Sequence, residues 1–193
     1  KQNAGNPAFI AERKGEDMEL YETIAARRSI RKYKEDPVPR ETLDRVLEAA
    51  RLAPSWCNRQ CHRYIVVSDP ETRKTLGELI DNPSVECYEK APYALVLCAE
   101  PSDSGFNAGK EYYLVDCGIS MEHLVLAAAA EGLGTCWVGY FPENPVRNLL
   151  GIPREVKVVA ITPLGVPDEA PSARPRVPLG KIVFEGAWRR DNA

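Results

Sequence analysis

The chain has 193 residues, of which 44% are hydrophobic and 27% charged, and its formal net charge is -3. This length suffices for one domain with its own apolar core, so neither disulfides nor a structural metal are needed for stability. The slightly acidic balance argues against nucleic-acid binding, because duplex-binding proteins normally present a basic face to the phosphates. No run of about 18 apolar residues and no signal-peptide pattern is present, so no membrane span is expected.

The cysteine pattern favours a reducing, cytoplasmic compartment. The six cysteines show no paired spacing, and Cys98 and Cys117 lie in apolar stretches typical of buried free thiols. Residues 1–17 have no clear periodicity, and Met18 looks like a natural start. The sequence therefore predicts a tail or added segment at 1–17 and a single domain over 18–193.

The first predicted elements are two helices and a strand. Residues 19–28 form a helical pattern, and 40–52 (RETLDRVLEAARL) are strongly amphipathic up to the stop at Pro54. The short β-branched run 64–68 (YIVVS) predicts a strand.

The middle of the chain predicts a helix, a buried strand and a buried central helix. Asp69 is a candidate N-cap for a helix over 70–80. The continuous apolar run 94–99 (ALVLCA) predicts a strand buried on both faces. Residues 116–131 (DCGISMEHLVLAAAAE) are apolar on nearly all sides and predict a buried helix, in which His123 is expected to be a satisfied core residue.

The last part predicts three strands, a short helix and an extended segment. The strands are expected over 136–140, 156–164 and 181–184, the helix over 144–150, and the extended Pro-rich segment over 165–178. Without a hairpin signal, helices interspersed with strands predict an α+β layered fold.

Three separate segments suit a ligand site. The segment 27–31 (RRSIR) places three arginines around a serine, which is typical of an anion site. Alternatively, the arginines lie at a helix C-terminus, where cations interact favourably with the helix dipole. The segment 53–60 (APSWCNRQ) combines a hydroxyl, an indole and two amides, which an ordinary turn also uses. The glycines of 132–141 (GLGTCWVGYF) permit close approach of a flat ligand or simple helix-strand packing.

Taken in order, these segments resemble the nitroreductase family of FMN-dependent flavoproteins. The family pattern is R-x-S-x-R/K, then A-P-S-x-x-N-x-Q, then G-L-G-T-x-W-x-G, then a basic pair before Pro-Leu, here Arg174 and Arg176. The resemblance covers about residues 18–183. It implies a three-layer fold with a mixed, mostly antiparallel sheet flanked by helices around a buried central helix, in an intertwined homodimer with FMN at the interface.

The resemblance also implies the site residues. The expected cofactor-binding residues are Arg27, Arg28, Ser29, Arg31, Pro54, Ser55, Trp56, Asn58, Trp137, Val138, Gly139, Arg174 and Arg176. The two basic segments would bind the ribityl phosphate, with Arg28 directed toward the ribityl chain or ring edge. The partner chain would supply the residues of 54–58, while 137–139 would lie along the ring with the Gly139 backbone N–H facing flavin N5.

The implied activity is ping-pong reduction of nitroaromatics, quinones or similar electrophiles by NADH or NADPH, with no side chain assigned as catalytic. A flavin-binding redox or storage protein with little NAD(P)H turnover, and a member of divergent chemistry such as a reductive dehalogenase, stay as alternatives.

One departure from the family pattern is the cluster Cys57, Cys61 and His62, where the family usually continues with Pro-Trp. These residues are too few for a metal site, so two tucked-in thiols and a polar substitution are expected. Trp56 is an alternative wall of the substrate cleft.

Overall fold

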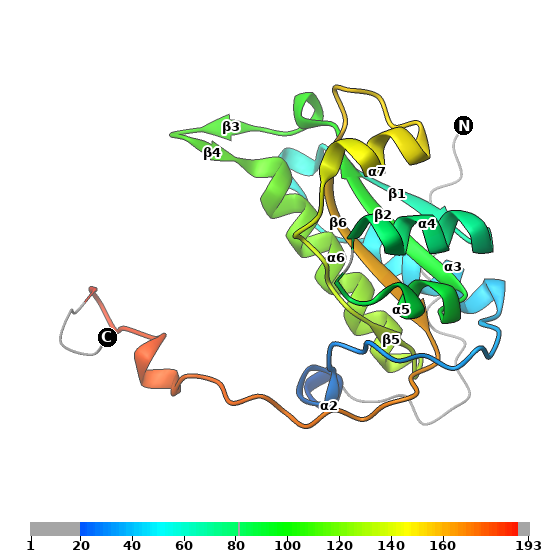
Figure 1. Ribbon diagram of the computed structural model, residues 1–193. Helices are drawn as coiled ribbons and strands as arrows, with labels where there is room; N and C mark the ends of the chain where they lie inside the picture. Colours follow the sequence, from blue (N-terminus) through cyan, green and yellow to red (C-terminus); the bar gives the residue numbers. More distant parts are fainter. Residues whose placement is uncertain (1–19, 81, 189–193) are drawn as a thin grey trace.

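A four-stranded antiparallel sheet forms the middle layer of the domain, in the order β1-β2-β6-β5 (Figure 1). The computed structural model describes residues 20–80 and 82–188, so the predicted tail 1–17 lies outside the described residues. The strands are β1 (His62–Val67), β2 (Tyr93–Ala99), β5 (Gly134–Thr135) and β6 (Lys157–Gly165). In register, Tyr64 pairs with Leu97 and Leu95 pairs with Thr162.

Helices cover both faces of this sheet, which confirms the predicted three-layer α+β fold. One face packs against α3 (Arg40–Arg51) and α6 (Tyr112–Ala130), and the other against α4 (Pro70–Ile80), α5 (Val85–Lys90) and α7 (Glu143–Leu150). Successive residues of β2 enter opposite cores: Leu95 and Leu97 face α3 and α6, while Val96 faces α4 and α5. The predicted burial of this strand on both faces is therefore confirmed.

The elements with the strongest local signals form as predicted. Helix α4 begins at Pro70, and the Asp69 carboxylate accepts hydrogen bonds from the backbone N–H and the hydroxyl of Thr72, at 2.8 and 2.7 Å. Helix α7 ends at Leu150 and is followed by Gly151, whose φ of 64° suits glycine at a helix C-terminus. His123 is half-buried, and its Nδ1 lies 3.3 Å from the Ala49 carbonyl oxygen.

Helix α6 begins one turn earlier than predicted and is only partly covered within one chain. Its 19 residues have the length and hydropathy of a membrane span, but 44% of that stretch is buried in the fold, as in a core helix. Leu114 and Val115 on its other side are 48% and 51% exposed. These two residues precede the predicted range, and within 116–131 only Glu122 is exposed while the others are buried or half-buried, so the predicted buried central helix is confirmed.

Two predicted strands are absent where they were expected. The pairing around 136–140 stops at Thr135, because the Cys136 N–H donates to the Thr162 hydroxyl, and only an isolated bridge from Val138 to Ile161 follows. Residues 181–184 form no strand either. The 3-10 turn η3 (Leu179–Lys181) lies there, in an exposed stretch that has no neighbouring strand among the described residues.

A hairpin that the sequence analysis missed precedes α6. Strands β3 (Phe106–Asn107) and β4 (Lys110–Glu111) pair around Ala108 and Gly109, with φ angles of 50° and 77°. Two successive positive φ angles are typical of the tight turns that join hairpin strands. Figure 1 shows this hairpin projecting beyond the N-terminal end of α6. The short helix α5, which follows Ser84, was also missed.

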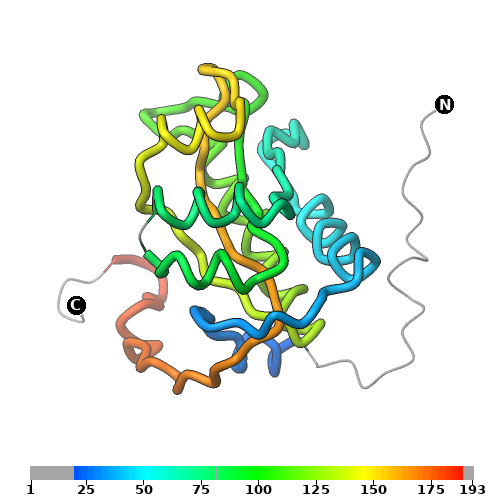
Figure 2. The backbone as a smooth tube through the Cα atoms, turned by 45° about the vertical axis from the view of Figure 1, so that its right-hand side comes forward, coloured from blue at the N-terminus to red at the C-terminus, as the bar shows by residue number. Residues whose placement is uncertain are grey.

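The N-terminal end of the described chain and the first part of the C-terminal segment lie together near the C-terminal end of α6. Helix α2 (Leu20–Ala26) ends before Arg27, two residues earlier than predicted. The segment 165–178 leaves β6, passes α2 in an extended form and continues away from the body of the domain (Figures 1 and 2). Backbone hydrogen bonds from Lys34 to Val166 and from Asp168 to Lys32 fix its first part.

Candidate functional site

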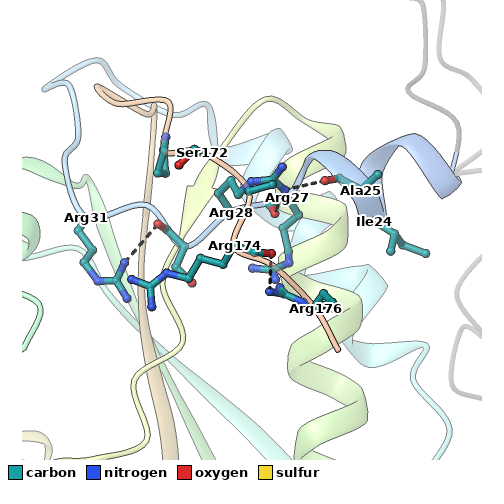
Figure 3. Close-up of a pocket in the computed structure, with 11 residues that line it drawn as sticks. Ile24, Ala25, Arg27, Arg28, Arg31, Ser172, Arg174 and Arg176 are labelled. Carbon is teal, nitrogen blue, oxygen red and sulfur yellow. Dashed lines mark hydrogen bonds between the residues drawn. The ribbon is translucent and has the colours of Figure 1, made fainter. Parts of the chain in front are cut away.

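The two basic segments meet around one hollow, which we call the arginine hollow. Its volume is about 460 Å³, and its lining residues are Ile24, Ala25, Arg27, Arg28, Ser29, Arg31, Pro171, Ser172, Ala173, Arg174 and Arg176. Figure 3 shows the side chains of Arg31 and Arg174 pointing toward one another from opposite sides. All five arginines of the two predicted segments, and Ser29, therefore lie at one place.

The charge in this hollow is uncompensated. None of its described lining residues is acidic, and within the described ranges none of the five guanidinium groups forms an ion pair. Like charges that converge without a counter-charge repel each other, so such a cluster is stable when an anion binds between its members.

Arg28 fits the alternative interpretation of the basic segment, in which an arginine stabilises the C-terminal end of a helix. The Arg28 guanidinium donates to the carbonyl oxygens of Ala25 and Arg27, at 2.6 and 2.7 Å, and so satisfies carbonyls at the end of α2 (Figure 3). Arg31 and Arg176 only reach carbonyls of their own segments, at 3.5 Å to Ser29 and 3.2 Å to Arg174. Their donors thus stay available for a ligand.

Two residues at this place were missed by the sequence analysis. Ser172 adds a second hydroxyl to the arginine hollow, and its signal was its position two residues before Arg174. Glu169 accepts a 2.5 Å hydrogen bond from the Arg31 backbone N–H and lines an adjacent hollow of about 450 Å³ with Arg27 and Arg28. This carboxylate lies beside the arginine hollow and is not part of its lining.

The segment 137–139 leaves the sheet close to the arginine hollow. Ser29 forms a parallel bridge with Thr135, so the basic segment and β5 are directly joined. Val138 is buried against the sheet, whereas Trp137 and Tyr140 are exposed by 42% and 92%. A Cβ added to Gly139 would meet only the Trp137 indole, at 3.4 Å or more, so neither crowding nor a positive φ in this chain requires glycine there.

The 54–60 loop lies at the other end of α6. The Trp56 backbone N–H donates to the Asp116 carboxylate, which is in the second turn of the helix, at 2.7 Å. A helix rises about 1.5 Å per residue, so the 14 steps from Asp116 to the C-terminal end of α6 at Ala130 correspond to roughly 21 Å. One chain therefore does not bring Pro54, Ser55, Trp56 and Asn58 to the arginine hollow.

The Trp56 ring is engaged within its own chain. A Cβ on Gly105 would lie 2.5 Å from this ring, so the indole packs directly on the backbone that leads into the hairpin. The Tyr112 ring centroid is 6.2 Å away, and the Arg59 guanidinium lies 5.8 Å over the indole. The loop and the hairpin base thus form one packed unit.

The Cys57, Cys61 and His62 cluster is divided by the fold. Cys61 is fully buried, and burial together with the Asp116 charge raises the pKa of its thiol to about 11. Cys57 lies in the loop with a φ of 48° and is exposed, so the prediction of two tucked-in thiols is wrong for this residue. Burial, and then Arg63, lower the pKa of His62. In the described part of the chain, no group of three or more His, Cys, Asp or Glu side chains is placed to hold a metal ion.

Comparison with known proteins gives consistent matches along the chain. The sequence model of the nitroreductase family matches residues 24–86 and 80–166. The FMN reductase [NAD(P)H] of Bacillus subtilis is 31% identical over 88% of this chain and 74% of its own length.

Solved structures agree with these matches. A nitroreductase family protein from Clostridium novyi NT has a TM-score of 0.75 and 41% identity, covering 78% of this chain and 87% of the other. The NADPH:FMN oxidoreductase from Vibrio harveyi, complexed with NAD+, has a TM-score of 0.80 and 30% identity, covering 90% and 80%.

Proposed function

The chain belongs to the nitroreductase family, and from this premise we propose that it is an FMN-dependent oxidoreductase that uses NADH or NADPH to reduce nitroaromatics, quinones or similar electrophiles. The observation that carries the proposal is the arginine hollow, in which five arginines and two serines converge with no acidic lining residue in the described chain. Relatives named as an FMN reductase and an NADPH-flavin oxidoreductase support the same cofactor and donor.

The residues of the arginine hollow fit the phosphate of FMN. A phosphate monoester carries a charge near -2 and three acceptor oxygens, which match forked guanidinium donors and hydroxyls. Arg27, Arg31, Arg174 and Arg176, with Ser29, are the proposed phosphate ligands. Arg28, which caps α2, is the proposed contact to the ribityl chain or ring edge.

A second copy of the chain is needed to complete the proposed site. The partner chain would supply the residues of its 54–60 loop, since the loop of the same chain lies at the far end of α6. Two apolar surfaces support a homodimer. One is the exposed side of α6 with Leu114 and Val115, and the other is the C-terminal segment, where Leu179 is 74% exposed.

The segment 137–139 is proposed to lie along the flavin ring. The open space at Gly139 allows a flat ligand to approach the backbone closely, and the Gly139 N–H is the proposed donor to flavin N5. The arginines are proposed to stabilise negative charge on the reduced cofactor. Bound FMN would supply the hydride chemistry, in two half-reactions that use one cleft in turn and so give ping-pong kinetics.

The proposed compartment is the cytoplasm, and the proposed acceptors are nitroaromatics, quinones or similar electrophiles. All six cysteines lie in the described part and are free, which suits a reducing cytoplasm. The acceptor class is proposed from the family alone. The fold does not decide it, because the same fold hosts divergent chemistries such as reductive dehalogenation.

Steady-state kinetics test the proposed function. With NADH or NADPH varied at several fixed concentrations of a quinone such as menadione, parallel double-reciprocal lines are expected for a ping-pong enzyme. A flavin carrier would bind FMN stoichiometrically but give no turnover with either nucleotide. Turnover only with a halogenated aromatic acceptor would favour the dehalogenase alternative.

A further inference from the structure

Asp116 is a buried carboxylate that joins three separate segments. It is 2% exposed and lies in the second turn of α6. One oxygen accepts the Trp56 backbone N–H at 2.7 Å, and the other accepts the Ser104 hydroxyl at 2.8 Å and the Cys61 thiol at 3.5 Å. Because the pKa of Cys61 is raised to about 11, this thiol stays protonated at neutral pH and can donate. A buried carboxylate is tolerated when donors surround it in this way.

The 54–60 loop needs such an external support because its backbone is strained. Three non-glycine residues of the loop have left-handed φ angles: Cys57 at 48°, Asn58 at 55° and Gln60 at 54°. Side chains disfavour this region, and residues held there persist only where the surroundings fix them. The Ser55 side chain does not cap the 3-10 turn η1 (Trp56–Asn58), since it accepts the Gln60 N–H instead, at 2.9 Å.

Asp116 therefore supplies the acceptor that the first N–H of this turn lacks within its own loop. Through Ser104 the same carboxylate holds the chain just before Gly105, on which the Trp56 ring packs. The Asp116 carboxylate thus links both the loop and the base of the β3–β4 hairpin to α6, beside the hydrogen bond from the Tyr112 N–H to the Gly105 carbonyl.

We propose that Asp116 is a positioning residue, which holds the 54–60 loop and the hairpin base in the geometry needed at the catalytic cleft. The inference rests on the proposed function, in which this loop faces the flavin ring bound by the partner chain. Asp116 itself touches no cofactor or substrate in this account. It acts through Trp56 and Ser104.

The chain offers a matched control on the same helix. Ser120 lies one turn further along α6, is fully buried, and hydrogen-bonds the Tyr64 hydroxyl at 2.9 Å and the Ala50 carbonyl at 3.0 Å. Ser120→Ala removes a buried polar group of α6 that contacts β1 and α3 but not the loop. Ser120→Ala is expected to reduce stability about as much as Asp116→Ala does, but to leave the geometry of the cleft unchanged.

The first readout is hydrogen exchange of the 54–60 loop, followed by mass spectrometry on the purified protein. Asp116→Ala is expected to speed exchange at Trp56 by about tenfold to a hundredfold, because the N–H loses its charged acceptor. Asp116→Asn keeps one oxygen for this N–H, so its exchange should lie between those of the parent and Asp116→Ala. Ser104→Ala should cause a smaller increase, and Ser120→Ala none.

The second readout is the kinetics with a quinone acceptor. The kcat/KM of Asp116→Ala is expected to fall by tenfold or more, since small displacements of positioning groups reduce rates strongly. The phosphate contacts to FMN should be retained, because the arginine hollow lies at the other end of α6. If Asp116→Ala does not fold, Asp116→Asn and Ser104→Ala decide the question with the same two readouts.

Unchanged exchange at Trp56, or equal losses of kcat/KM in Asp116→Ala and Ser120→Ala, would overturn the inference. The exchange measurement needs no flavin. A protein without FMN would contradict the proposed function. Faster exchange in the Asp116 variants would still support the role of Asp116 in holding the 54–60 loop.

Discussion

Removing Arg27 and Arg176 together tests the arginine hollow from both of its basic segments. In the described chain neither guanidinium is ion-paired, and Arg176 donates only to carbonyls of its own segment, at 3.2 and 3.5 Å. The double substitution to alanine should therefore leave the fold nearly unchanged. Hydrogen bonds to a charged group are each worth about 1.5–3 kcal/mol, so losing two should weaken FMN binding by about 3–6 kcal/mol. This corresponds to a roughly 10²- to 10⁴-fold higher dissociation constant.

The assay is a fluorescence titration of the flavin-free protein with FMN and, separately, with riboflavin, which lacks the phosphate. The parent protein should bind FMN far more tightly than riboflavin, and the double variant should bind both about equally. Arg154→Ala, which removes an exposed arginine in the turn before β6, should behave like the parent. Equal affinity of the parent for FMN and riboflavin, or unchanged FMN affinity in the double variant, would refute the phosphate assignment.

Three further predictions address the ring segment, the packing near the hollow and the shared site. Gly139→Ala should leave the melting temperature unchanged but weaken FMN binding about tenfold or more, because its Cβ has room in the chain but not against a ring. Gly134→Ala should destabilise the fold by about 1–3 kcal/mol in thermal unfolding, because its Cβ would lie 2.8 Å from Ile30, whereas Gly180→Ala, with nothing within 4 Å, should not. A hybrid dimer of the double arginine variant and an Asn58→Gly chain should recover about half the parent activity, because one of its two sites is then intact.

Each of these predictions has a distinct contrary result. If Gly139→Ala binds FMN as tightly as the parent protein, the flavin ring does not lie along the segment 137–139. A melting temperature of Gly134→Ala equal to that of Gly180→Ala would contradict the close packing between β5 and Ile30. If the hybrid dimer is inactive, and the double arginine variant and Asn58→Gly are each inactive alone, the whole site lies within one chain.

The elements that the sequence predicts well are those defined by local chemistry. The helix over 70–80 has its N-cap in Asp69 and forms with the predicted bounds. The amphipathic helix over 40–52 ends one residue early, at Arg51. In both, the apolar face and the ends are set by residues within the helix or next to it.

The errors occur where the structure depends on distant residues. The predicted strand 136–140 is interrupted because Cys136 bonds to a side chain of β6, which no local pattern reveals. Ile182, Val183 and Phe184 are apolar, but a strand needs a partner for its backbone groups. The hairpin turn at Ala108 and Gly109 was missed because its flanking strands are only two residues long.

The composition of the candidate site and the meeting of its basic segments 27–31 and 174–176 were predictable. The 54–60 loop lies apart from them within one chain, in line with the resemblance, which assigns this loop to the partner chain. The sequence analysis did not single out Asp116. Its one signal in the sequence was its acidic side chain within an apolar helix. A buried carboxylate at such a position requires hydrogen-bond donors from elsewhere in the fold.

The visible spectrum of the purified protein, recorded before and after anaerobic addition of NADH or NADPH, tests the central claim most directly. We expect a yellow protein with about one FMN per chain, whose long-wavelength flavin band bleaches with at least one of the two nucleotides. A colourless protein that takes up no FMN, or a yellow one that neither nucleotide bleaches, would contradict it.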